Sequence, residues 1–122
     1  MNNKTVLIAS IFGAISVILG AFGTHYLKTI FSPELLSSFE TGVKYQFYHS
    51  IVLLFVAISS FENKQKSILQ NLFSAGIILF SGSIYLLCYL KTNQIENFKA
   101  IGILTPIGGL FFIFAWLAMA YF

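Results

Sequence analysis

The chain has 122 residues, of which 57% are hydrophobic and 9% are charged. Soluble domains have about 45–50% apolar and about 25% charged residues. Seven basic and four acidic side chains could not cover the surface of a soluble domain with so many large apolar groups. The composition therefore excludes an ordinary soluble globule, argues against disorder, and indicates an integral membrane protein.

The hydrophobic residues form four blocks without Asp, Glu, Lys or Arg, at residues 5–27, 45–61, 67–90 and 100–122. A membrane-spanning helix needs about 17–25 such residues, and backbone in lipid must satisfy its own hydrogen bonds. We therefore predict an all-α fold with one integral membrane domain, residues 1–122. Its spans are expected at about 5–27, 43–61, 67–90 and 100–122. The first block is too long for the core of a signal peptide, so we expect it to be retained. The short links favour an up-down four-helix bundle.

The link before the second span carries its own helix signal. Ser32, Pro33 and Glu34 fit an N-cap, a proline at the first helical position and an acid in the first turn. Apolar residues then recur at helical spacing. We expect a short interfacial helix that either turns at Gly42 or continues into the second span.

Four spans place both termini on one side of the membrane. That side would carry Lys4, Lys64 and Lys66, and the opposite side the other four lysines. This count gives no positive-inside bias, and it leaves dual topology open; the pair at 64 and 66 favours cytoplasmic termini. The net charge of +3 suits anionic lipid headgroups. Without arginine or a basic cluster, we expect no nucleic-acid partner.

Small residues follow one face of the first span, including Gly13, Gly20 and Gly23. Such faces let two helix backbones approach closely in lipid. This face is expected to pack on another helix of the chain, with a homo-oligomer seam as the alternative. Further packing positions are expected at Gly82 in the third span, and at Pro106, Gly108 and Gly109 in the fourth. Pro106 cannot donate a hydrogen bond to the carbonyl of Gly102, which predicts a kink.

Scarce polar side chains inside the spans need hydrogen-bond partners. On helices, Tyr45, Gln46 and His49 share one side of the second span, and Ser81 and Tyr85 one side of the third. Antiparallel packing brings His25, at the end of the first span, toward the same membrane face. We therefore expect a polar cluster inside the bundle, a candidate ligand site, made by His25, Tyr45, Gln46, His49, Ser81 and Tyr85.

Four motifs in order resemble a known family. They are Gly-Ala-Phe-Gly-Thr-His at 20–25, Tyr-Gln-Phe-Tyr-His at 45–49, Phe-Ser-Gly-Ser-Ile-Tyr at 80–85 and Thr-Pro-Ile-Gly-Gly at 105–109. This pattern is similar to the YgdD/YwdK-like small membrane proteins, a family of unknown function. Thr24 departs from the alanine associated with that place. The resemblance implies four spans and a bacterial inner-membrane or equivalent location, and it supplies no activity.

Three functions are compatible with these features. The leading hypothesis is a structural or accessory protein that self-associates or serves as a small subunit of a membrane complex. The alternatives are intramembrane binding of a quinone, a lipid or, less favoured, haem at the polar cluster, and proton or ion translocation by an oligomer. We favour a protein that is not an enzyme, because no carboxylate lies within a span and no nucleophile elbow or phosphate loop is present. One cysteine and two histidines also give little basis for a metal site, so none is expected. We expect no cofactor.

Overall fold

The computed structural model describes residues 2–94 and 99–122, which form helices connected by short links. In chain order these helices are α1 (Asn3–Val17), α2 (Thr24–Leu27), α3 (Pro33–Ile58), α4 (Asn63–Gly76), α5 (Gly82–Thr92) and α6 (Lys99–Tyr121). Two wide π-helical turns, η1 (Ile18–Gly23) and η2 (Ile77–Ser81), join α1 to α2 and α4 to α5. The described residues thus form four long helical rods.

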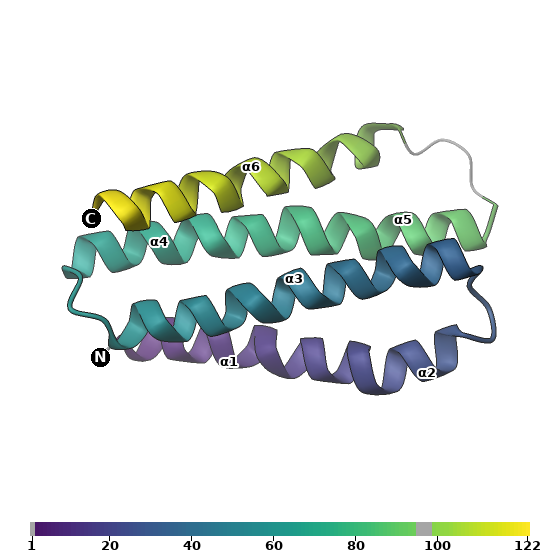
Figure 1. Cartoon of the computed structure of the whole chain (residues 1–122), viewed down its shortest axis with the longest axis horizontal. Helices are drawn as coiled ribbons and strands as arrows, with labels where there is room; N and C mark the ends of the chain where they lie inside the picture. The colour runs from purple at the N-terminus through teal and green to yellow at the C-terminus, as the bar shows by residue number, and fades with distance from the viewer. Residues whose placement is uncertain (1, 95–98) are drawn as a thin grey trace.

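The rods lie side by side in the order α1–α2, α3, α4–α5 and α6, and neighbours along the chain are antiparallel (Figure 1). Both termini lie at one end (Figure 1). The predicted all-α, up-and-down arrangement is confirmed. Three rods, Asn3–Leu27, Asn63–Thr92 and Lys99–Tyr121, are long and apolar enough to cross a membrane.

The remaining rod, α3, differs because its first half carries the charged residues Glu34, Glu40 and Lys44, and Gln46 and His49 follow near its middle. The helix runs for 26 residues without interruption, so the chain continues from the predicted interfacial segment into the second span and does not turn at Gly42. Its N-terminus is capped as predicted: the Ser32 hydroxyl accepts a hydrogen bond from the Leu35 amide at 3.2 Å, and Pro33 opens the helix. In Figure 1, α3 lies between α1 and α4–α5 along its length. It is therefore in the same environment as these two apolar rods.

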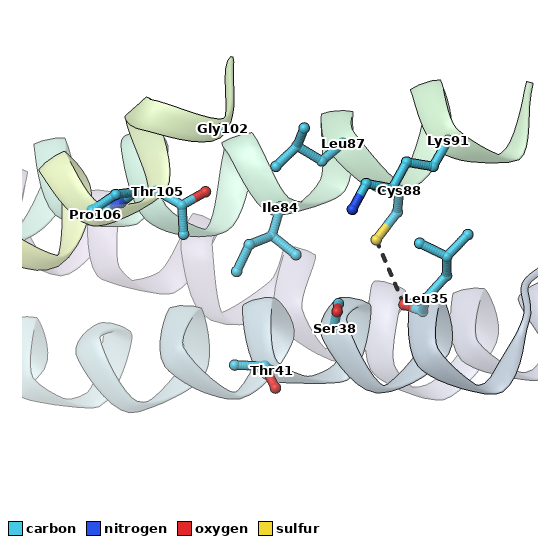
Figure 2. A pocket seen from close by; sticks show the side chains of 10 residues that line it. All are labelled: Leu35, Ser38, Thr41, Ile84, Leu87, Cys88, Lys91, Gly102, Thr105 and Pro106. Carbon is cyan, nitrogen blue, oxygen red and sulfur yellow. Dashed lines mark hydrogen bonds between the residues drawn. The ribbon is translucent and has the colours of Figure 1, made fainter. Parts of the chain in front are cut away.

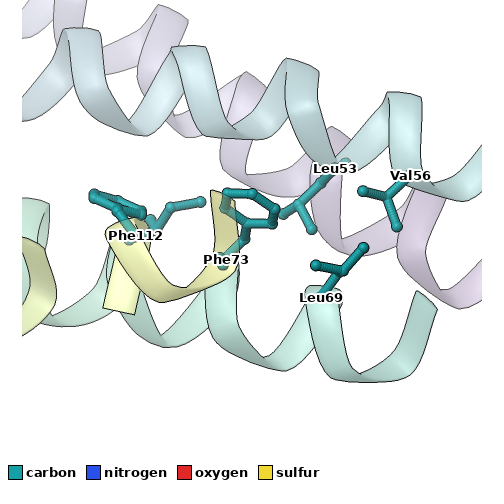
Figure 3. Close-up of a cluster of buried hydrophobic side chains, with 8 residues drawn as sticks. Leu53, Val56, Leu69, Phe73 and Phe112 are labelled. Atoms are coloured by element: carbon teal, nitrogen blue, oxygen red, sulfur yellow. The ribbon is translucent and has the colours of Figure 1, made fainter. Parts of the chain in front are cut away.

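The apolar core occupies the half of the protein nearer the termini. Leu53 and Val56 of α3 meet Leu69 and Phe73 of α4 there, and Phe112 of α6 closes the cluster (Figure 3). All but Phe112 are fully buried, and Phe112 is 4% exposed. The opposite faces of the same helices expose large apolar side chains, as expected where lipid replaces water as the solvent.

Several glycines lie where two rods contact each other. A Cβ atom added to Gly20 would lie 3.3 Å from Val43, and one added to Gly13 would lie 3.9 Å from Ser50. The small-residue face of the first span thus packs on α3 within the chain. At Gly108 of α6 the contact is with backbone, because a Cβ atom there would lie 2.7 Å from the Cα atom of Phe80 in η2.

Not every expected packing glycine is in such a contact. A Cβ atom on Gly82 would meet nothing within 4 Å, so packing does not require glycine there, whereas one on Gly109 would lie at an ordinary 4.0 Å from the Phe80 ring. Pro106 lies inside α6, which continues through it.

The contrast between Gly108 and Gly82 is testable. Alanine normally stabilises a helix by about 1 kcal/mol relative to glycine, but at position 108 its methyl group would collide with the backbone of η2. We expect Gly108→Ala to lower the free energy of unfolding in detergent by about 1–3 kcal/mol, and Gly82→Ala to leave it unchanged or raise it slightly. Equal stability of the two variants would contradict the close contact between α6 and η2.

Candidate functional site

Gln46 lies at the centre of a polar network that joins three rods. Its side chain is 3% exposed. The amide Nε2 donates a hydrogen bond to the Phe12 carbonyl of α1 at 2.9 Å. The amide Oε1 accepts one from the Tyr85 hydroxyl of α5 at 2.7 Å. One side chain of α3 therefore links its two neighbouring rods.

Serine hydroxyls extend this network along the same interface. Ser81 is fully buried in η2, and its hydroxyl donates to the Gly42 carbonyl of α3 at 2.6 Å. Gly42 is tightly enclosed, because a Cβ atom there would lie 3.0 Å from the Tyr85 ring. Ser50 donates back to the Gln46 carbonyl at 2.7 Å within α3. Ser81, Gln46 and Tyr85 are thus brought together as the sequence predicted.

His49 is 6% exposed and forms the second part of the site, on the side of α3 toward α6. Its Nδ1 atom lies 2.6 Å from the Tyr45 carbonyl, and its Nε2 atom lies 3.2 Å from the indole nitrogen of Trp116. A carbonyl can only accept and an indole can only donate, so the proton is on Nδ1 and the imidazole is neutral. The ring stacks on Phe112 at a centroid distance of 3.7 Å.

Of the other two predicted members, His25 lies outside the cluster and Tyr45 lies at its edge. His25 is on the exposed surface of α2, and among the described residues no hydrogen bond joins it to the network. Tyr45 is 40% exposed and stacks on Phe80 at 4.7 Å, so it contributes its carbonyl and its ring face. The hydrogen-bonding atoms of Gln46 and His49 are engaged within the protein. A ligand could use them only by displacing these bonds.

A second polar group, near the termini, was not anticipated from the sequence. Lys66 is 5% exposed, and its ammonium group donates to the Ala57 carbonyl near the end of α3 at 3.0 Å. Beside it, the Thr5 hydroxyl donates to the Gln70 side chain at 2.6 Å. The spacing of Lys66, Leu69, Gln70 and Phe73 on one helix face was the signal available. A buried Lys66 also removes one of the two lysines that favoured cytoplasmic termini.

Comparison with known proteins identifies the family. The model for "Protein of unknown function (DUF423)" matches residues 19–109. A UPF0382 membrane protein of Haemophilus influenzae is 38% identical over 122 residues, covering 99% of this chain and 94% of its own. YwdK, a UPF0382 membrane protein of Bacillus subtilis, is 33% identical and covers 92% and 89%. A UPF0382 membrane protein of Schizosaccharomyces pombe is 37% identical and covers 92% and 94%.

The chain therefore belongs to the DUF423/UPF0382 family of membrane proteins, whose function is unknown. The resemblance to YwdK-like proteins seen in the four motifs is confirmed. The chain is a small multi-pass membrane protein, and its relatives occur in bacteria and in yeast. No solved structure matches it.

The link between Gln46 and Tyr85 can be measured with a double-mutant cycle. Gln46→Leu and Tyr85→Phe each remove one partner of a bond within the membrane, where such bonds contribute about 0.6 kcal/mol and up to about 1.7 kcal/mol. We expect a coupling free energy in that range from unfolding in detergent micelles. A cycle between Gln46→Leu and Tyr48→Phe is the control, because Tyr48 is 53% exposed. Equal coupling in both cycles would show that Gln46 and Tyr85 are not joined by this hydrogen bond.

Trp116 is the single tryptophan, so its indole proton gives one NMR signal. Because this proton is donated to His49, we expect His49→Ala to move the signal upfield. His25→Ala should leave the signal in place, because His25 lies on the exposed surface of α2. The measurement is a proton–nitrogen spectrum of the protein in micelles. An indole chemical shift that is unchanged in His49→Ala would disprove the hydrogen bond between Trp116 and His49.

Proposed function

We propose that this protein is a structural or accessory component of the membrane, which self-associates or joins a larger complex as a small subunit. The observation that carries this proposal is that the polar side chains inside the protein form hydrogen bonds between its own rods. Gln46, Ser81 and Tyr85 link α3 to its neighbours through hydrogen bonds, and the His49 bond to Trp116 links α3 to α6. These groups rigidify a scaffold.

The arrangement of the rods also supports a role in assembly. The two outer rods bury only 11% and 17% of their apolar segments within the protein. They therefore offer two long helix faces to lipid or to helices of another chain. The glycine face of α1 is already used against α3, so self-association would use the outward faces of the edge rods.

The alternatives find less support in this geometry. A quinone, lipid or haem at the predicted polar cluster would compete with the internal bonds of Gln46 and His49. A proton path through His49 would require breaking its bond to Trp116, since Nε2 is the acceptor there. An assembly role needs neither step.

The location that we propose is a bacterial inner membrane or its equivalent, with both termini in the cytoplasm. The presence of both chain ends at one end of the protein supports a common side (Figure 1). Of the lysines at that end, Lys4 and Lys64 are exposed and are available to follow the positive-inside rule.

Photo-crosslinking at three phenylalanine positions tests the assembly proposal. A photoreactive phenylalanine analogue would replace Phe22 or Phe114, which are 72% and 56% exposed on the two edge rods, or the fully buried Phe73 as control. In native membranes we expect at least one outward position to give a defined adduct, either a dimer of this chain or a single membrane partner. Phe73 should give none.

The size of the extracted protein gives the result that would contradict the assembly proposal. After mild solubilisation, an assembly runs above the 13.6 kDa of one chain. A lone monomer by light scattering, together with no protein adduct at Phe22 or Phe114, would refute the proposal.

A further inference from the structure

A cavity of about 470 Å³ lies between α3, η2 and α6. Most of its wall is made of rings, which belong to Tyr45, Tyr48, His49, Phe80, Phe112 and Trp116. Gly109 also lines it, so that part of the wall is the backbone of α6. The size of the cavity is within the range of about 300–1,000 Å³ that is usual for small-molecule sites.

The rings of this wall are held in fixed orientations by one another. Tyr45 stacks on Phe80 at a centroid distance of 4.7 Å, and His49 stacks on Phe112 at 3.7 Å. The bond between Trp116 and His49 fixes the indole. Aromatic rings pair best with other flat rings, in offset or edge-to-face arrangements. The wall therefore favours a planar, unsaturated ligand over a flexible chain.

The cavity lies halfway along the membrane-spanning rods. Phe80 is near the middle of the rod Asn63–Thr92, and Gly109 is near the middle of the rod Lys99–Tyr121. At 1.5 Å per residue, each of them is about 15 Å or more from both ends of its rod. The hydrocarbon core of a bilayer is about 30 Å thick. The cavity is therefore near the bilayer centre, away from water and lipid headgroups.

Two tyrosine hydroxyl groups at this depth have no partner in the protein. Tyr45 and Tyr48 line the cavity with their ring centroids 6.0 Å apart. Within residues 2–94 and 99–122, neither hydroxyl makes a hydrogen bond, whereas the Tyr85 hydroxyl donates to Gln46. An unpaired polar group in hydrocarbon is costly. The two phenols therefore need an acceptor from outside the chain.

A second cavity, of about 430 Å³, differs in this respect. Figure 2 shows it between α3, α5 and α6, with a dashed line from the Cys88 thiol to the Leu35 carbonyl. The Thr105 hydroxyl, also on its wall, is bonded to Ser83. These groups are engaged within the protein, and the cavity lies toward the membrane surface, where water is available. Neither condition holds for the two phenols at the bilayer centre.

We propose that the mid-membrane cavity binds a lipid-soluble quinone in its oxidised form. The flat ring lies beside Gly109 among the aromatic rings, and its carbonyl oxygens accept hydrogen bonds from the Tyr45 and Tyr48 hydroxyls. The apolar tail leaves past Tyr48, whose side chain is exposed to lipid. This binding leaves the internal bonds of Gln46 and His49 intact. It does not depend on the assembly proposed above.

Quenching of Trp116 fluorescence measures this binding, because Trp116 is the single tryptophan and lines the cavity. The full chain, in phosphatidylcholine nanodiscs, is titrated with decylubiquinone, whose ring quenches tryptophan on contact. A bound quinone lowers the intensity without shortening the lifetime of the remaining fluorescence, whereas collisions within the bilayer shorten that lifetime. We expect saturable quenching at constant lifetime.

Removal of each hydroxyl tests the hydrogen bonds. Tyr45→Phe and Tyr48→Phe keep the rings, and both side chains are exposed, so folding is preserved. We expect each variant to raise the half-saturating mole fraction of decylubiquinone roughly 3- to 15-fold, the range that one hydrogen bond within a membrane provides. Tyr26→Phe is the matched control, because Tyr26 is exposed on α2 and does not line the cavity. It should leave the titration unchanged.

Filling the cavity tests the place of binding. A Cβ atom on Gly109 would lie at an ordinary 4.0 Å from the Phe80 ring, so in Gly109→Leu the rest of the side chain occupies the cavity. Gly82→Leu is its control, because a Cβ atom there meets nothing within 4 Å and Gly82 does not line the cavity. We expect the saturable quenching to disappear in Gly109→Leu and to persist in Gly82→Leu.

Two results would overturn the quinone proposal. One is quenching of the native chain that is collisional only, with a lifetime that falls in step with the intensity. The other is a loss of binding in Tyr26→Phe and Gly82→Leu that equals the loss in the cavity variants. The two tyrosine variants keep the test decisive if Gly109→Leu fails to fold.

Discussion

The burial of polar atoms on α3 is the constraint on which the rest of this structure depends. Within a span, an amide or imidazole without a hydrogen-bond partner is costly, because lipid offers none. Gln46 and His49 of α3 therefore require donors and acceptors on the neighbouring rods, and find them at Phe12, Tyr85 and Trp116. These bonds determine the rotation of α3 about its axis. They also explain how a helix with charged residues in its first half occupies the centre of an apolar protein.

Glycine contacts and π-helical turns allow the close packing of the rods that these hydrogen bonds need. Short hydrogen bonds between rods require the backbones to lie close together, and Gly42 and Gly108 leave room for that approach at the Tyr85 ring and the backbone of Phe80. The turn η2 contains both Phe80 and Ser81. It thus presents one face to α6 and a hydroxyl group to α3. Close backbone packing and a hydrogen bond between rods are thus both made by this short segment.

Much of this architecture could be predicted from the sequence. Charge-free blocks predict the rods, the Ser32–Pro33 pair predicts the start of α3, and helical spacing places Gln46 and His49 on one side. The exposed position of His25 could not be predicted, because η1 lies directly before it. A π-helical turn inserts a residue, and each extra residue rotates the following side chains by about 100° relative to a regular helix. The position of Lys66 beside a link favours an exposed side chain, but the residue lies on the apolar face of α4 and is buried.

Spin labels along α3 test the orientation of this helix most directly. Single cysteines from position 43 to 58, in a Cys88→Ser background, would carry a nitroxide, and collisions with oxygen dissolved in the bilayer would be measured by electron paramagnetic resonance. We expect maxima at positions 48, 51, 55 and 58, whose side chains are exposed, and minima at 46, 49, 53 and 56, whose side chains are buried. High oxygen accessibility at positions 46 and 49 would mean that the polar face of α3 points into lipid, and would contradict the burial of Gln46 and His49 between the rods.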